Sequence, residues 1–232
     1  MKEEIINDLN TKPQDIIHSM SNAALSSIPY VGSFISEIFN QILVSPVEKR
    51  KEKWLVNIAE SIDELNNKVD GFSIEKLADN DLFISILNRA SQLAISNHQQ
   101  EKLESFHNAV INTAMAITID ENEQMMFLNL VDSMTPWHIK ILYYFKNPKN
   151  RFIESGKTSP RYMMGSPIDP LTEYYTDLKD RKELINLIIK DLYINGIMNT
   201  ENLNATMTEE GIYAPRLTPY GERFLKYISK NQ

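Results

Sequence analysis

The chain has 232 residues, of which 42% are apolar, and only 7 glycines and 10 prolines, so fibrous and low-complexity classes are excluded. It has no cysteine, which excludes disulfides, zinc sites built on thiolates and cysteine nucleophiles, and which is typical of a reducing compartment. The first ten residues carry acids and no long apolar run. We therefore expect a cytoplasmic protein without a secretory signal.

Charge divides the chain into two parts. Up to Met134 there are 10 Lys and Arg against 20 Asp and Glu, a net charge of −10, and from Thr135 onward there are 14 against 11, a net charge of +3. The two values sum to the overall charge of −7. This asymmetry predicts two modules with different partners, an acidic helical bundle over 1–134 and a second domain over 135–232.

The first module contains an unusually apolar stretch. Ala23 to Val44 carries a single charge, Glu37, over a length that could span a bilayer. Its apolar residues follow helical spacing: Phe34, Ile35, Ile38, Phe39 and Ile42. One interpretation is a membrane-inserting hairpin. The other is a core helix pair with a proline-glycine corner, which the polar residues on the opposite face favour.

The rest of the first module predicts a helical bundle. A helix after Pro46 ends near Gly71 and carries an apolar seam of Leu55, Ile58, Ile62, Leu65 and Val69. Three further helices are expected over 79–97, 99–117 and 120–134. Their short polar joints favour antiparallel packing.

The second module predicts helices followed by a small β-ribbon and a closing helix. Helices are expected over Trp137–Lys146, Leu171–Leu178 and Arg181–Asn195, with an irregular stretch over Asn147–Pro170. Two short strands are then expected, Ile197–Thr200 and Ile212–Leu217, and Thr218-Pro219 opens the last helix.

This order resembles the winged-helix domains of bacterial regulators. The residues that carry the resemblance are Leu192, Gly196, Ile197, Leu217, Thr218, Gly221, Phe224 and Leu225. The resemblance implies a mainly α fold, an N-terminal helical bundle followed by a winged helix with a two-stranded wing. It implies little about function, because such domains bind either DNA or proteins.

The whole layout also resembles bacterial proteins of the abortive-infection alpha type. The match rests on Phe127 to Phe145, which reads FLNLVDSMTPWHIKILYYF, and on the C-terminal part. The resemblance implies a role in antiviral defence.

No pattern predicts a catalytic or metal site. Ser155-Gly156-Lys157-Thr158 lacks the earlier glycine of a phosphate loop, since Arg151 stands there. His98 and His107 fall on opposite faces of a helix, and no serine lies in a G-x-S-x-G turn. We expect neither an enzyme nor a cofactor nor a metal.

Binding of a macromolecule is the function that the residues favour. The candidate surface has two parts: Lys149, Arg151, Lys157 and Arg161 in the loop, and Arg181, Lys182, Asn186 and Lys190 on the third helix of the winged helix. The wing, by contrast, is acidic, with Glu201, Glu209 and Glu210. We therefore expect the partner to be either DNA or a protein, including a second copy of the chain. The alternative is a membrane-active effector that uses the apolar segment 23–44.

Overall fold

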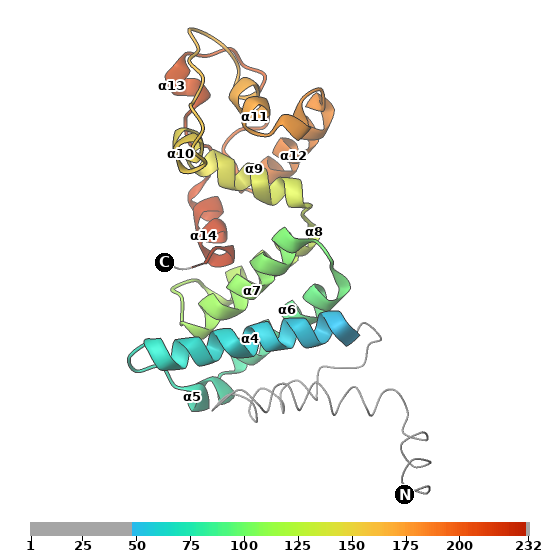
Figure 1. Cartoon of the computed structure of the whole chain (residues 1–232), viewed down its shortest axis with the longest axis vertical. Coiled ribbons are helices and arrows are strands. Elements are labelled where there is room, and N and C mark those ends of the chain that lie inside the picture. Colours follow the sequence, from blue (N-terminus) through green and yellow to red (C-terminus); the bar gives the residue numbers. More distant parts are fainter. Residues whose placement is uncertain (1–47, 231–232) are drawn as a thin grey trace, which may run out of the picture. The chain divides into compact units, whose positions relative to one another are not determined.

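The structure, a computed structural model, describes residues 48–230 of the chain. These residues form eleven α-helices and one 3₁₀ helix, so the prediction of a mainly α protein is confirmed (Figure 1). The apolar segment 23–44, with Phe34, Ile35, Ile38, Phe39 and Ile42, lies outside the described residues. Within the part that is described, no helix is both long and apolar enough to cross a bilayer.

The chain divides into two compact units. Among the described residues, the first comprises 48–98 and 103–128, and the second comprises 99–102 and 129–230. The division falls inside two helices, α7 (Gln100–Ala114) and α8 (Glu121–Ser133). The start of α7 and the end of α8 belong to the second unit.

The first unit is a helical bundle in which α6 (Asp81–Ser96) packs against α4 (Glu48–Lys68) and α5 (Ile74–Ala78). Leu55, Ile58 and Ile62 of the predicted seam are buried, whereas Val69 at its end is 37% exposed. Two polar contacts join helices inside the bundle. The Trp54 indole donates to Ser91 Oγ at 3.0 Å, and Ser61 Oγ lies 2.9 Å from His107 Nε2.

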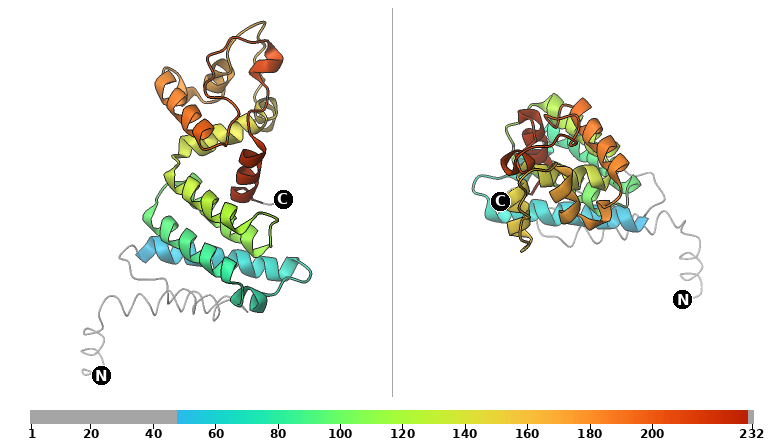
Figure 2. Two further views of the ribbon diagram at one scale, coloured as in Figure 1. Left: turned by 180° about the vertical axis from the view of Figure 1, so that it is seen from behind. Right: turned by 90° about the horizontal axis from the view of Figure 1, so that it is seen from above.

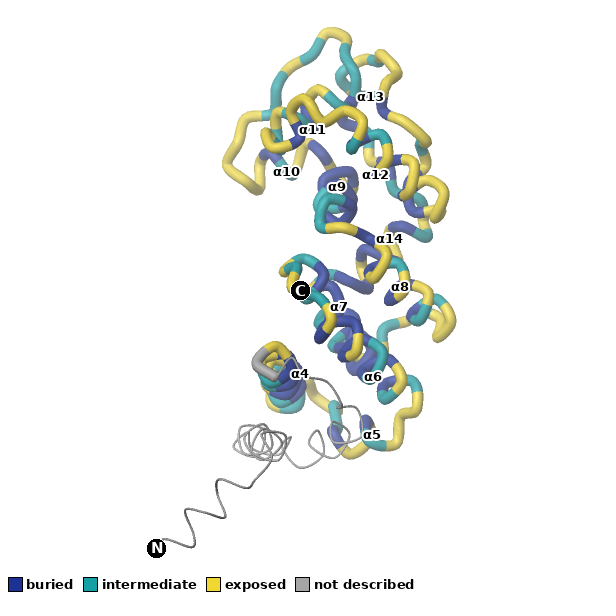
Figure 3. Tube along the Cα trace, turned by 90° about the vertical axis from the view of Figure 1, so that its right-hand side faces the viewer, coloured by how far each residue is buried: buried dark blue, intermediate teal, exposed yellow. Residues whose placement is uncertain are grey.

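The second unit is built around α9 (Pro136–Lys146), whose inward side chains are almost fully buried (Figure 3). Three helices pack against it, α10 (Pro148–Glu154), α12 (Lys182–Ile194) and α14 (Pro219–Ile228). The remaining elements are α11 (Ile168–Tyr174), η1 (Thr176–Leu178) and α13 (Glu209–Ile212). A single helix thus supports most of this unit.

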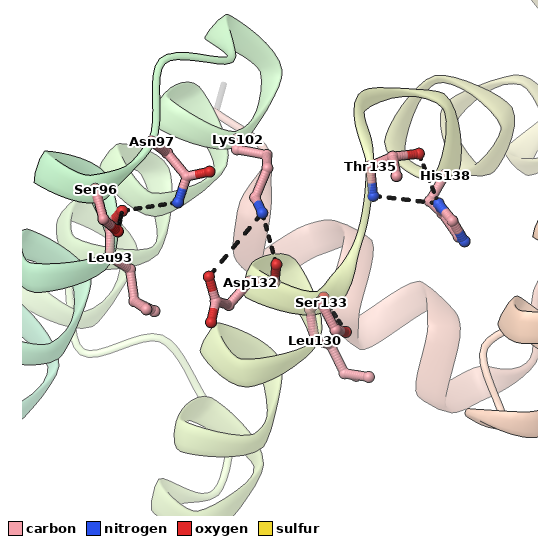
Figure 4. Close-up of polar contacts among 9 residues, drawn as sticks. All are labelled: Leu93, Ser96, Asn97, Lys102, Leu130, Asp132, Ser133, Thr135 and His138. Atoms are coloured by element: carbon pink, nitrogen blue, oxygen red, sulfur yellow. Dashed lines mark hydrogen bonds and ion pairs between the residues drawn. The ribbon is translucent and has the colours of Figure 1, made fainter.

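The start of α9 is fixed by a side-chain cap. His138 Nδ1 accepts from the Thr135 backbone N–H at 3.2 Å and lies 2.9 Å from Thr135 Oγ1 (Figure 4). On its other side, His138 Nε2 lies 3.5 Å from Asp191 Oδ2 of α12. His138 therefore connects the first turn of α9 to the outer helix of the unit.

A second buried contact lies in the same unit. Lys102 is 5% exposed, and its Nζ donates to the Asp132 backbone carbonyl at 2.6 Å, with Asp132 Oδ1 at 4.0 Å (Figure 4). Burial lowers the pKa of Lys102.

The prediction of an irregular stretch over 147–170 was wrong for its first part, because residues 148–154 form α10. Asn147 Oδ1 accepts from Asn150 N at 3.2 Å, and Pro148 occupies the first helical turn. Pro170, too, lies inside a helix, since α11 begins at Ile168. Only about 155–167 remains irregular.

In place of the two predicted wing strands, one antiparallel bridge joins Met198 to Leu217, and no strand occurs among residues 48–230. A second bridge joins Gly165 to Met207. Ile212 ends the short helix α13 instead of starting a strand. The guanidinium of Arg216 is turned inward, where Nη2 donates to the Gly211 carbonyl at 2.7 Å.

Thr218 and Gly221 hold the start of α14 against the turn after α12. Thr218 Oγ1 accepts from Gly221 N at 2.9 Å and donates to the Gly196 carbonyl at 2.5 Å. A Cβ on Gly221 would lie 2.1 Å from the Ile197 carbonyl oxygen, so no larger residue fits there. Gly196 has a φ of +71°, the left-handed conformation that ends α12.

Candidate macromolecule-binding surface

Helix α12 has one face in the core and one in solvent. Its inward residues are Ile185, Ile188, Ile189 and Leu192, all at most 1% exposed. On the outside, Leu187 is 63% exposed, Tyr193 44% and Ile194 68%. Large apolar side chains are thus presented to solvent on the helix that the sequence singles out as the recognition helix.

The four predicted binding residues of α12 do not share one environment. Arg181, Lys182 and Lys190 are exposed. Asn186 is half-buried, and its side-chain Oδ1 is enclosed by protein atoms. The acids Glu183 and Asp191 are exposed on the same helix, so the three cations are reduced to a net charge of only +1.

The basic residues of the 149–161 segment are mostly engaged within the second unit. Lys149 Nζ lies 3.2 Å from Glu209 Oε1, and Arg151 Nη1 lies 2.9 Å from Glu154 Oε2. Lys157 Nζ donates to the Tyr174 carbonyl at 3.0 Å. Arg161 is exposed.

Aromatic rings add to these internal contacts. The charged groups of Lys149, Arg151 and Lys157 lie 5.4, 5.4 and 4.7 Å from the ring centroids of Tyr213, Tyr143 and Tyr174, respectively. Phe152, the aromatic residue between these cations, is 2% exposed. The aromatic side chain of this segment therefore belongs to the core.

The wing region supplies a carboxylate to this network. The hydrogen bond from Lys149 holds the pKa of Glu209 below its usual value, and the charge of Arg161 acts in the same direction. Tyr213 lies beside it and donates to the Pro160 carbonyl at 2.7 Å. Burial, the largest cause, raises the pKa of Tyr213 to about 12.

Sequence reasoning missed the exposed apolar residues of α12. Leu187 and Ile194 lie seven residues apart and fall outside the inward stripe of Ile185, Ile188 and Leu192. A helical projection that separates the two stripes would have found them.

The described residues also bear on the catalytic and metal alternatives. Within residues 48–230, no three His, Asp or Glu side chains gather as a metal site would require. Lys157 of the Ser155–Thr158 sequence is held by Tyr174, and Gly156 follows the end of α10 rather than opening a helix.

One open cavity of about 340 Å³ lies in the first unit, where the end of α4 meets the end of α7. Val69, Phe72, Leu77, Ala114 and Met115 form its apolar part, and its lining contains no histidine. It therefore lacks a group that exchanges protons readily near neutral pH.

Comparison of the chain with protein-family models, with curated proteins and with solved structures gives no match.

Proposed function

We propose that this protein is a non-enzymatic bacterial regulatory or defence-associated protein of the cytoplasm, whose second unit is a winged helix that binds a protein partner. The observation that carries the proposal is the outer face of α12, where Leu187 and Ile194 are 63% and 68% exposed. Exposed apolar side chains at helical spacing are typical of protein interfaces.

The winged-helix assignment is supported by local geometry at its characteristic residues. Thr218 caps α14 and bonds to the turn after α12, and Gly221 makes close contact with Ile197. The bridge between Met198 and Leu217 lies at the base of the expected wing. The defence role is supported by the resemblance of Phe127–Phe145 and the C-terminal part to abortive-infection proteins.

DNA is the weaker partner on the same surface. A duplex reader needs cations free to neutralise phosphates. Lys149, Arg151 and Lys157 contact carboxylates, a carbonyl and tyrosine rings instead. The exposed cations Arg181, Lys182 and Lys190 are largely offset by Glu183 and Asp191 nearby, which leaves a net charge of +1.

Two measurements test this proposal. A photo-crosslinking amino acid at position 187, in cells that produce the full chain, should give a protein adduct, whereas the same amino acid at exposed Glu60 of α4 should not. A gel shift with duplex DNA at low salt should show no complex. A shift that disappears when Arg181, Lys182 and Lys190 are changed to Glu would establish a DNA reader instead.

The defence role needs its own assay. Phage should plate less efficiently on cells that carry the wild-type chain than on cells without it, and Leu187→Asp should remove that protection. Equal plating on both strains would contradict the defence role and would leave the proposed protein binding by α12 unaffected.

A further inference from the structure

We infer that the outer face of α12 binds a second copy of this chain, with the two helices antiparallel about a two-fold axis. This inference rests on the proposed protein-binding role of α12 and names its partner. Helix α12 runs along the outside of the second unit, so that its outer face is open to solvent (Figure 2).

The outer face of α12 is complementary to itself when its direction is reversed. Leu187 and Ile194 are the apolar ends of one stripe, and Lys190 and Asp191 lie between them at helical spacing. Leu187 and Ile194 are 63% and 68% exposed, and the Asp191 side chain is 61% exposed. The order along the stripe is apolar, basic, acidic, apolar.

This order is what a two-fold interface requires, since the same patch must be complementary to itself. An axis that passes between Lys190 and Asp191 sets Leu187 against Ile194 of the second copy. The same axis sets Lys190 against Asp191 of the second copy, twice by symmetry. Parallel helices would instead bring Lys190 against Lys190 of the second copy, where like charges repel.

The small area of the stripe limits the strength of the contact. Two helices that cross at about 8–10 Å through one such face bury less than the roughly 800 Å² per partner of a standard interface. Tyr193, 44% exposed beside the stripe, adds some apolar area. Association is therefore weak and reversible, and it depends on protein concentration.

Sedimentation velocity of the purified full chain, from about 1 to 300 μM, tests the inference. The wild-type chain should shift from monomer to dimer across this range. Leu187→Asp should prevent the shift. Lys190→Glu and Asp191→Lys should each weaken self-association about tenfold, because each places like charges across the axis.

Mixing the two charge variants is the decisive arm. In an antiparallel pair, the glutamate introduced at position 190 of one variant meets the lysine introduced at position 191 of the other. The unchanged Asp191 of the first meets the unchanged Lys190 of the second, so the mixture should associate at least as strongly as the wild-type chain. Circular dichroism of each variant, checked beforehand, shows that it is folded. A mixture as weak as its separate components would overturn the inference, as would a wild-type chain that stays monomeric throughout.

The outcomes also separate this inference from the proposed function. A monomer in the centrifuge together with an adduct from position 187 to a different protein rejects self-association and keeps the protein-binding role. An absence of any protein adduct, combined with DNA binding through Arg181, Lys182 and Lys190, rejects both.

Discussion

The 149–161 segment and the outer face of α12 look alike in sequence, since both mix cations with large apolar side chains. In the structure they differ. Three of the four cations of the segment lie against Glu209, Glu154 and tyrosine rings, and its Phe152 is buried. Its fourth cation, Arg161, and its Ile153 are exposed. On α12, Leu187 and Ile194 remain in solvent. Similar composition therefore serves mainly internal packing in one region and provides a candidate interface in the other.

The position of α12 depends on the contacts between the start of α14 and the turn after α12. Among these, we expect the contact of Gly221 to be the most sensitive to substitution. We expect Gly221→Ala to destabilise the second unit by about 3 kcal/mol, because its Cβ would lie 2.1 Å from the Ile197 carbonyl oxygen. Chemical denaturation followed by circular dichroism measures this loss.

Gly156→Ala is the matched control. Gly156 has a φ of +68° but open space around a Cβ, so only its backbone conformation opposes the change. We expect a cost of about 1 kcal/mol. Equal costs at the two glycines would show that the contact with Ile197 is not what restricts position 221.

Thr218 tests the same contact between α14 and the turn after α12, with a smaller expected effect on stability. Thr218→Val keeps the shape but removes the hydroxyl that caps Gly221 N and bonds to the Gly196 carbonyl. We expect a loss of about 1–2 kcal/mol in unfolding free energy. Thr218→Ser should recover most of it, and a serine variant as unstable as the valine variant would assign the effect to packing of the methyl group.

These residues also show how far sequence reasoning reaches. Helix order and the Thr218-Pro219 start could be predicted because caps and apolar periodicity are local signals. The absence of the wing strands could not be predicted, because Ile197–Thr200 and Ile212–Leu217 have strand-like composition. In the structure, Ile212 ends α13 and the side chain of Arg216 is turned inward. Likewise, nothing local shows that Lys149 has Glu209 as its partner sixty residues later.

His138 provides a test of the α12 side of the comparison, because it contacts Asp191, a residue of the proposed interface. Burial lowers the pKa of His138. The unfolded chain therefore takes up the proton first as pH falls, and stability that is present above about pH 6.5 should be lost below it. His138→Gln, which can still cap Thr135, should remove this pH dependence of the unfolding free energy.

The smallest effect is expected in the 149–161 segment. Glu209→Gln removes the partner of Lys149, an ion pair whose side chains are 50% and 35% exposed. Because water and salt screen such a pair, the unfolding free energy should change little, and 1 M salt should erase the difference from the wild-type chain. The variant is more informative in binding. If Glu209 were what keeps Lys149 from phosphates, releasing Lys149 would create a gel shift with duplex DNA. We expect none, because Arg151 and Lys157 keep their own contacts with Glu154 and Tyr174, so releasing one lysine does not free the cations of the segment.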